Sequence, residues 1–103
     1  LGPGLLESTY EQCLAREFKI NNIPFKLQYP LPIDYKGIKL DCGYRIDILV
    51  EDKLLLELKS VEKVLPIHEA QILTYMKLAN ISVGLLINFN VETLTKGIRR
   101  FVI

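Results

Sequence analysis

The sequence contains few cysteines, glycines and prolines, no long hydrophobic run and almost no net charge. Two cysteines are too few for a disulfide scaffold, so we expect a cytoplasmic protein with free thiols and with Cys13 in the core. No apolar run approaches the roughly 20 residues of a membrane helix. With 6 glycines, 5 prolines and half of its 103 residues apolar, the chain is neither disordered nor of low complexity. The net charge of +1 argues against a basic nucleic-acid-binding tail.

Two periodicities predict an alternation of helices and strands. Apolar residues recur every three or four positions in some segments, which is typical of helices, and alternate in others, which is typical of strands. Residues 34–37 have the composition of a turn, and residues 51–53 are short enough for a hairpin loop. The predicted helices are 5–21 and 66–80, and the predicted strands are 25–29, 38–50, 54–61, 82–89 and 98–103.

This order predicts an α+β fold of the form αβββαβ. A three-strand meander followed by a helical crossover implies a mixed central sheet flanked by helices. Because the chain shows no linker, repeat or charge block, we expect residues 1–103 to form a single domain. The chain begins with Leu1-Gly2-Pro3-Gly4 rather than with Met, and we therefore expect an N-terminal segment to be missing or trimmed.

Three charged residues interrupt the apolar strands around the predicted hairpin loop. Asp47 and Glu57 each lie within an apolar run, where an unpaired carboxylate covered on both faces of a sheet would cost several kcal/mol. A three-residue loop would pair Val50 with Leu54. Asp47 then falls opposite Glu57, and Lys59 lies on the same face. Two carboxylates and an ammonium group at one point predict a site for a divalent metal ion, and the alternative is a salt bridge without a function.

Polar residues on the two predicted helices could complete such a site. Gln71 and Tyr75 are four residues apart on one face of the second helix, beside its apolar stripe. Taken alone, this pair is better explained as a boundary that covers the rim of the sheet. Glu7 and Tyr10 share a face near the start of the first helix, where a carboxylate also suits the helix dipole.

Several segments along nearly the whole chain carry recognisable motifs: LGPGLLE at 1–7, a GxxExxY pattern at 4–10, the strand pair at 44–50 and 55–59, and the later segments 66–71 and 84–89. Together they resemble one known family, the GxxExxY proteins. These proteins are assigned to the PD-(D/E)XK nuclease superfamily, which implies a restriction-endonuclease-like αβββαβ core. The Pro of the superfamily's name is replaced here by Ile46.

The resemblance implies a metal-dependent nuclease site with Mg²⁺ or Mn²⁺ as the cofactor. Lys59 would be the catalytic lysine, and Gln71 and Tyr75 look like the QxxxY motif that RecB-type nucleases place beside the metal. The metal would position water for in-line attack on a phosphodiester. The implied metal ligands are Glu7, Asp47, Glu57 and the backbone carbonyl of Leu58.

Several cations in the second half of the chain are candidate contacts for nucleic-acid phosphates. For each of them ordinary solvated charge is the alternative, and for His68 a hydrogen-bonded place at the end of a helix is the other explanation. The candidates are Lys63, His68, Lys96, Arg99 and Arg100.

These observations lead to three hypotheses about function. The first is a metal-dependent nuclease that acts on DNA, the favoured partner, or on RNA. The second is a nuclease-fold module that binds nucleic acid or a protein partner without cutting, and the third is a structural domain with a buried salt-bridge cluster. We expect no membrane partner. A homodimer is a further hypothesis, because a chain this small makes few phosphate contacts alone.

Overall fold

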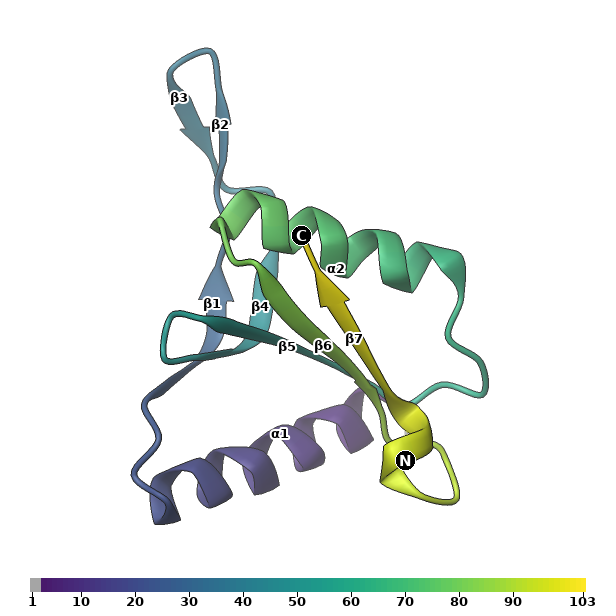
Figure 1. The fold of residues 1–103 in the computed structure, drawn as a ribbon. Helices are drawn as coiled ribbons and strands as arrows, with labels where there is room; N and C mark the ends of the chain where they lie inside the picture. Colours follow the sequence, from purple (N-terminus) through teal and green to yellow (C-terminus); the bar gives the residue numbers. More distant parts are fainter. Residues whose placement is uncertain (1–2) are drawn as a thin grey trace.

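A mixed five-stranded sheet lies between two helices in the computed structural model, which describes residues 3–103 (Figure 1). Leu1 and Gly2 of the LGPGLLE segment, and the side chains of residues 3–6 and of Leu94, lie outside what it describes. The fold class is α+β, as the sequence predicts. In chain order the elements are α1 (Pro3–Ile20), β1 (Phe25–Pro30), β2 (Ile33–Tyr35), β3 (Ile38–Leu40), β4 (Arg45–Val50), β5 (Leu54–Lys59), α2 (Pro66–Ala79), β6 (Val83–Asn88), the 3-10 helix η1 (Leu94–Gly97) and β7 (Ile98–Val102).

The predicted meander and helical crossover are both confirmed. The strand order is β1-β4-β5-β6-β7, and all neighbours are antiparallel except β5 and β6. Parallel neighbours need a crossover connection, and α2 provides it. Pro66 stands in the first turn of α2, where its missing N–H has no partner to lose, and Asn80 ends the helix in the left-handed region with φ 57°.

Each helix covers one face of the sheet (Figure 1). On the α2 face, Ile72 and Met76 are fully buried in a core that includes Leu55 and Leu86. A second core on the opposite face contains other side chains of β4, β5 and β6, and α1 packs against it. Among the described residues, no helix is both long and apolar enough to cross a membrane.

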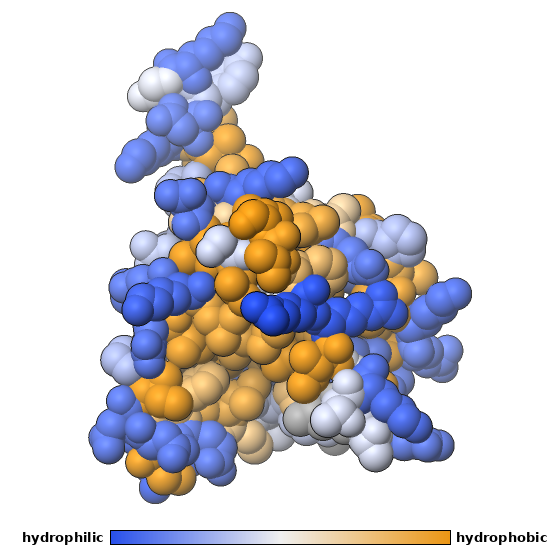
Figure 2. Space-filling model, in the orientation of Figure 1, coloured by the Kyte–Doolittle hydropathy of each residue, from blue (hydrophilic) through white to orange (hydrophobic). Residues whose placement is uncertain are grey.

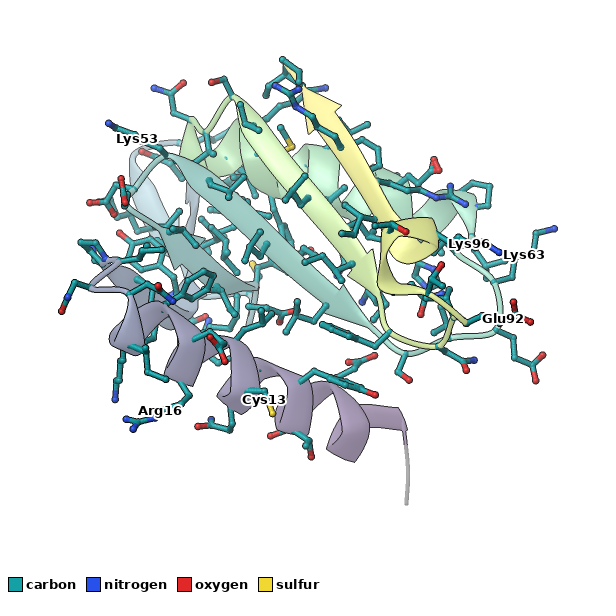
Figure 3. All side chains as sticks on the ribbon, turned by 60° about the horizontal axis from the view of Figure 1, so that its bottom comes forward. Cys13, Arg16, Lys53, Lys63, Glu92 and Lys96 are labelled. Carbon is teal, nitrogen blue, oxygen red and sulfur yellow. The ribbon has the colours of Figure 1, made fainter. Side chains whose placement is uncertain are left out.

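The buried side of α1 does not include Cys13. Leu14 and Phe18 pack against the second core, and Glu11 and Ala15 are buried. At 100° per residue, Cys13 lies about 200° from both Glu11 and Ala15, on the other side of the helix. Cys13 is therefore exposed and points away from the sheet (Figure 3), and its predicted place in the core is wrong.

A second hairpin replaces part of the predicted continuous strand 38–50. Asp41 accepts a hydrogen bond from the N–H of Gly43 (2.9 Å), and Gly43 adopts φ 77°, so the chain turns here. The segment before this turn, β3, pairs with β2 rather than with the central sheet. Lys36 and Gly37 form the tip with φ of 50° and 84°, the positive values that suit a two-residue hairpin turn.

This hairpin projects from the body of the protein (Figure 1). A hydrogen bond from the N–H of Leu31 to the carbonyl oxygen of Tyr44 (2.9 Å) closes its base. Tyr35 and Ile38 are 58% and 63% exposed, so they contribute little to either core. Figure 2 shows hydrophilic residues over most of the hairpin and a concentration of hydrophobic ones over the central strands. The hairpin is thus a local excursion between β1 and β4.

Asn88 fastens the connection after β5 to the end of β6. Its buried amide accepts a hydrogen bond from the N–H of Val61 (3.1 Å) and donates one to the Val61 carbonyl oxygen (2.8 Å). We expect Asn88→Ala to lower the free energy of unfolding by about 2–3 kcal/mol, because three backbone groups lose their partner: the N–H and the carbonyl of Val61, and the N–H of Asn90, which also donates to Asn88 Oδ1 (3.2 Å). The thermal midpoint should fall by roughly 10 °C or more, whereas the exposed Asn90→Ala should leave it nearly unchanged. A midpoint for Asn88→Ala within about 2 °C of the wild type would contradict this role.

Candidate functional site

The ladder between β4 and β5 stops before it reaches Asp47 and Glu57. The predicted pairing of Val50 with Leu54 is confirmed, and only two further pairs follow it. Beyond them, the N–H of Asp47 donates to Glu57 Oε1 (3.3 Å), and the N–H of Leu58 donates to Asp47 Oδ2 (2.8 Å). Carboxylate oxygens thus replace backbone partners and hold the two acids together where the strands part.

The two carboxylates reach this point from different faces of the sheet. Glu57 alternates with Leu56 and Leu58, which belong to the α1-face core, so Glu57 lies on the α2 face. Asp47 lines a cavity beside α1 instead. Strict alternation fails in β4, because Ile46 and Ile48 are two residues apart and yet pack in different cores. The expectation that both acids share one face is therefore wrong, although they do meet.

Glu57 is a buried acid with an unusual proton affinity. Its side chain is only 4% exposed. Burial, and next the charge of Asp47, raise the pKa of Glu57 from 4.5 to about 8. The N–H of Asp47 and the charge of Lys59 act in the opposite direction without cancelling the rise. A second positive charge at this point would favour the ionised form of Glu57.

Lys59 lies two residues after Glu57, at the end of β5 and on the same face of that strand. Its side chain is half-buried. In the described part of the chain, none of the ion pairs involves Lys59, Asp47 or Glu57. The salt bridge that the sequence allows as an alternative is thus not among the contacts of residues 3–103. The ammonium group is close enough to Glu57 for its charge to lower the pKa of that acid, without an ion-pair contact.

The Gln71–Tyr75 pair of α2 lies beside these acids. The Gln71 side-chain amide donates to the hydroxyl of Tyr75 (3.0 Å), and Tyr75 is 6% exposed. Burial raises the pKa of Tyr75, the hydrogen bond from Gln71 lowers it, and the charges of Glu57 and Asp47 raise it further. The ring of Tyr44 packs against Tyr75 with centroids 5.9 Å apart. The pair therefore forms a wall of the site as well as a boundary of the core.

A cavity of about 330 Å³ opens on the α1 side of the same point. Glu7 is fixed there because its Oε1 accepts a hydrogen bond from the N–H of Ser60 (3.1 Å). Glu11 and Gln28 were not predicted from the sequence. Glu11 follows Glu7 by four residues on one helix face, a spacing that could have indicated it. The lining residues are Glu7, Ser8, Glu11, Gln28, Asp47 and Leu58.

The donors at this point suit a hard divalent cation. Asp47, Glu57 and the Leu58 carbonyl offer only oxygen atoms, and Mg²⁺ is typically held by one or two carboxylates together with waters. Within residues 3–103, no three His, Cys, Asp or Glu side chains are grouped so that they could hold a metal ion. The predicted three-acid set with Glu7 is therefore not assembled, and the residues fit a metal held by the Asp47–Glu57 pair.

Two of the candidate phosphate contacts have structural partners. His68 Nδ1 accepts a hydrogen bond from the N–H of Leu65 (3.0 Å), which caps α2 and agrees with the helix-end explanation. Arg99 Nη1 lies 2.8 Å from Glu69 Oε2 on α2. Arg100 follows Arg99 in β7 and therefore points to the other face. These three cations do not form a single patch.

The two candidate lysines are exposed. Lys96 Nζ is 3.9 Å from Glu92 Oε2, and both side chains are largely in solvent, which makes this pair weak. Figure 3 shows Lys63 and Lys96 towards one end of the molecule and Lys53 towards the other. Because β5 ends near the first two, a phosphate at the acids would find Lys63 and Lys96 on its own side of the protein.

A mixed sheet between two helices, with two acids and a lysine where central strands part, defines a nuclease-type fold. The sequence model of the PD-(D/E)XK nuclease superfamily matches residues 1–101, and the chain belongs to that superfamily. Comparison with curated proteins and with solved structures gave no significant match.

Proposed function

We propose that the chain is a metal-dependent nuclease that hydrolyses phosphodiester bonds in DNA or RNA. The observation that supports this best is the meeting of Asp47 and Glu57 where β4 and β5 part, with Lys59 two residues further along. Stability does not explain this arrangement, because well-packed apolar residues are often at least as stabilising as buried charges. A reaction that needs a cation and a nearby ammonium group does explain it.

The chemistry follows from the positions of these side chains. Asp47, Glu57 and the Leu58 carbonyl would hold Mg²⁺ or Mn²⁺, which when bound supplies Lewis-acid activation of water and neutralises charge on phosphorus. Lys59 places a fixed positive charge beside the phosphate or orients the attacking water. Tyr75, held by Gln71, closes the α2 side of the site against bulk water.

The finer assignment within the superfamily is also a proposal. Residues 4–10 carry the GxxExxY signature, which supports membership of the GxxExxY proteins. We favour DNA over RNA as the partner, with Lys63 and Lys96 as phosphate contacts. A cytoplasmic location is consistent with Cys13 and Cys42, which are both free thiols. A homodimer would enlarge the surface available for phosphate contacts.

A second candidate is a nuclease-fold module that binds a nucleic acid or a protein without cutting. The pairing of Arg99 with Glu69 and of Lys96 with Glu92 lowers the non-specific affinity for phosphates, so it favours the form of this candidate that binds a protein partner. This candidate predicts binding that weakens with salt and no metal-dependent cleavage.

Cleavage of labelled nucleic acids by the purified chain tests the proposed function. We expect single-stranded or double-stranded DNA, or RNA, to be shortened with Mg²⁺ or Mn²⁺ and to stay intact with EDTA. Calorimetric titration with Mn²⁺ on the wild type and on Glu57→Ala separates the alternatives. Binding by the wild type without any cleavage would favour the non-cutting module. Equal absence of binding in both proteins would indicate a structural domain.

A further inference from the structure

The pairing of β1 with β4 is interrupted between Gln28 and Asp47. Gln28 adopts φ 48°, in the left-handed region, which is unfavourable for a residue with a β-carbon. The regular alternation of side chains is broken at this position. Leu27 packs in the α1-face core, whereas Tyr29, two residues later, packs in the α2-face core. An unfavourable backbone conformation is thus maintained at the residue that lies opposite a candidate metal ligand.

The side chain of Gln28 links two carboxylates across this interruption. Its Nε2 donates to Glu11 Oε1 (2.7 Å) and, at a longer 3.4 Å, to Asp47 Oδ1. An amide nitrogen carries two hydrogens, so it can serve both acceptors. The opposite amide orientation would direct an oxygen at two carboxylates. The contacts therefore define which end of the amide faces the cavity.

Glu11 anchors this link to α1. Its side chain is only 9% exposed, and a buried carboxylate needs hydrogen-bond donors. The contact with Gln28 provides one and ties β1 to the helix. On the far side, the N–H of Leu58 holds the second oxygen of Asp47 (2.8 Å). Each oxygen of Asp47 is thus held by a donor from a different strand, which fixes the direction of the carboxylate.

We propose that Gln28, anchored by Glu11, is a positioning residue that orients Asp47 towards the metal ion. This inference rests on the proposed function, since it concerns how the same site holds its cation. Groups that hydrogen-bond to metal ligands set their orientation, and their loss typically costs 10–100-fold in metal affinity. The strained backbone of Gln28 is then explained by where it puts the amide, rather than by any contribution to the core.

Gln28→Gly separates this role from a merely structural one. Glycine adopts a positive φ without strain, which offsets part of the stability lost when the buried Glu11 loses its donor, so the thermal midpoint should fall only modestly. The amide is lost, and we expect the affinity for Mn²⁺, measured by calorimetric titration, to fall by about 10–100-fold. A residue with only a structural role would shift the thermal midpoint without this loss of affinity.

Further variants keep the test decisive. Gln28→Ala removes the same amide if the glycine variant should fold poorly, and Gln12→Ala on the exposed side of α1 is the matched control. Glu11→Ala should weaken Mn²⁺ binding less than Gln28→Gly does, because the amide remains but loses its anchor. The double variant should lose no more affinity than Gln28→Gly alone, since both residues act through one link.

The Mn²⁺ titrations and the cleavage assay together distinguish a failure of the positioning role of Gln28 from a failure of the proposed nuclease activity. Mn²⁺ affinity like that of the wild type in both Gln28→Gly and Gln28→Ala overturns the positioning role, whether or not the protein cleaves nucleic acid. Loss of affinity in these variants, in a protein whose wild type binds Mn²⁺ but cleaves nothing, supports the positioning role and overturns the nuclease. A wild type that binds no Mn²⁺ overturns both.

Discussion

We expect Lys59→Ala to lower the rate of the proposed metal-dependent cleavage by about 10²–10³-fold and to leave the affinity for Mn²⁺ within a few-fold of the wild type. The reason is the place of the ammonium group, which lies beside Glu57 at the end of β5 without an ion pair in the described part of the chain. Because no carboxylate of the described residues is in ion-pair contact with it, this ammonium group can approach a phosphate directly. Initial cleavage rates of a labelled oligonucleotide with saturating Mn²⁺ measure the effect.

Two further variants serve as controls for Lys59→Ala. Lys53→Ala removes an exposed lysine from the opposite end of β5 (Figure 3) and should cleave like the wild type. Asp47→Ala should lose both cleavage and Mn²⁺ affinity, because it removes a candidate metal ligand rather than a nearby charge. Undiminished activity in both Asp47→Ala and Lys59→Ala would show that the reaction takes place elsewhere.

Without metal, the protein should lose stability as the pH rises from about 4.5 to 8, because the pKa of Glu57 is raised from 4.5 to about 8. Over this window folded Glu57 keeps a proton that the unfolded chain releases, so each pH unit favours unfolding by up to about 1.4 kcal/mol. The loss from this one group is of the order of 3–5 kcal/mol and is complete above about pH 8. Below pH 4.5 its contribution is constant.

The contribution of Glu57 is isolated by comparison with Glu57→Gln, which cannot ionise. The difference in the free energy of unfolding between the two proteins, from denaturant titrations, should change across the window, whereas Glu62→Gln in an exposed loop should follow the wild type. Mg²⁺ binds the ionised acid, so it should stabilise the wild type more at pH 8 than at pH 5. A difference between wild type and Glu57→Gln that does not vary with pH would contradict the raised pKa.

Local patterns in the sequence determine most of the central fold. The short loop 51–53 defines the register of β4 and β5, and Pro66 with Asn80 delimits α2, so these predictions are confirmed. The break in strand 38–50 escaped prediction because it depends on one hydrogen bond between Asp41 and Gly43 within an otherwise strand-like segment. The distribution of apolar residues there cannot reveal it.

The candidate site was predictable in its members but not in its geometry. Register arithmetic brings Asp47 to Glu57, and the structure confirms that the two acids meet. The register does not predict on which face of the sheet each acid lies, because that prediction assumes a regular strand and β4 is irregular at Asp47. Gln28 and Glu11 depend on contacts between residues 17 and 19 positions apart and on a left-handed backbone angle, neither of which a sequence pattern reports.

The hydrogen bond between Leu31 and Tyr44 has a consequence for how this protein can change over evolutionary time. It joins the end of β1 to the start of β4, so the chain between them leaves and re-enters the sheet at the same place. That segment can grow, shrink or take on new residues without shifting the strand that carries Asp47. The candidate site and the projecting arm can therefore diversify independently, the first under strict geometric constraint and the second under little.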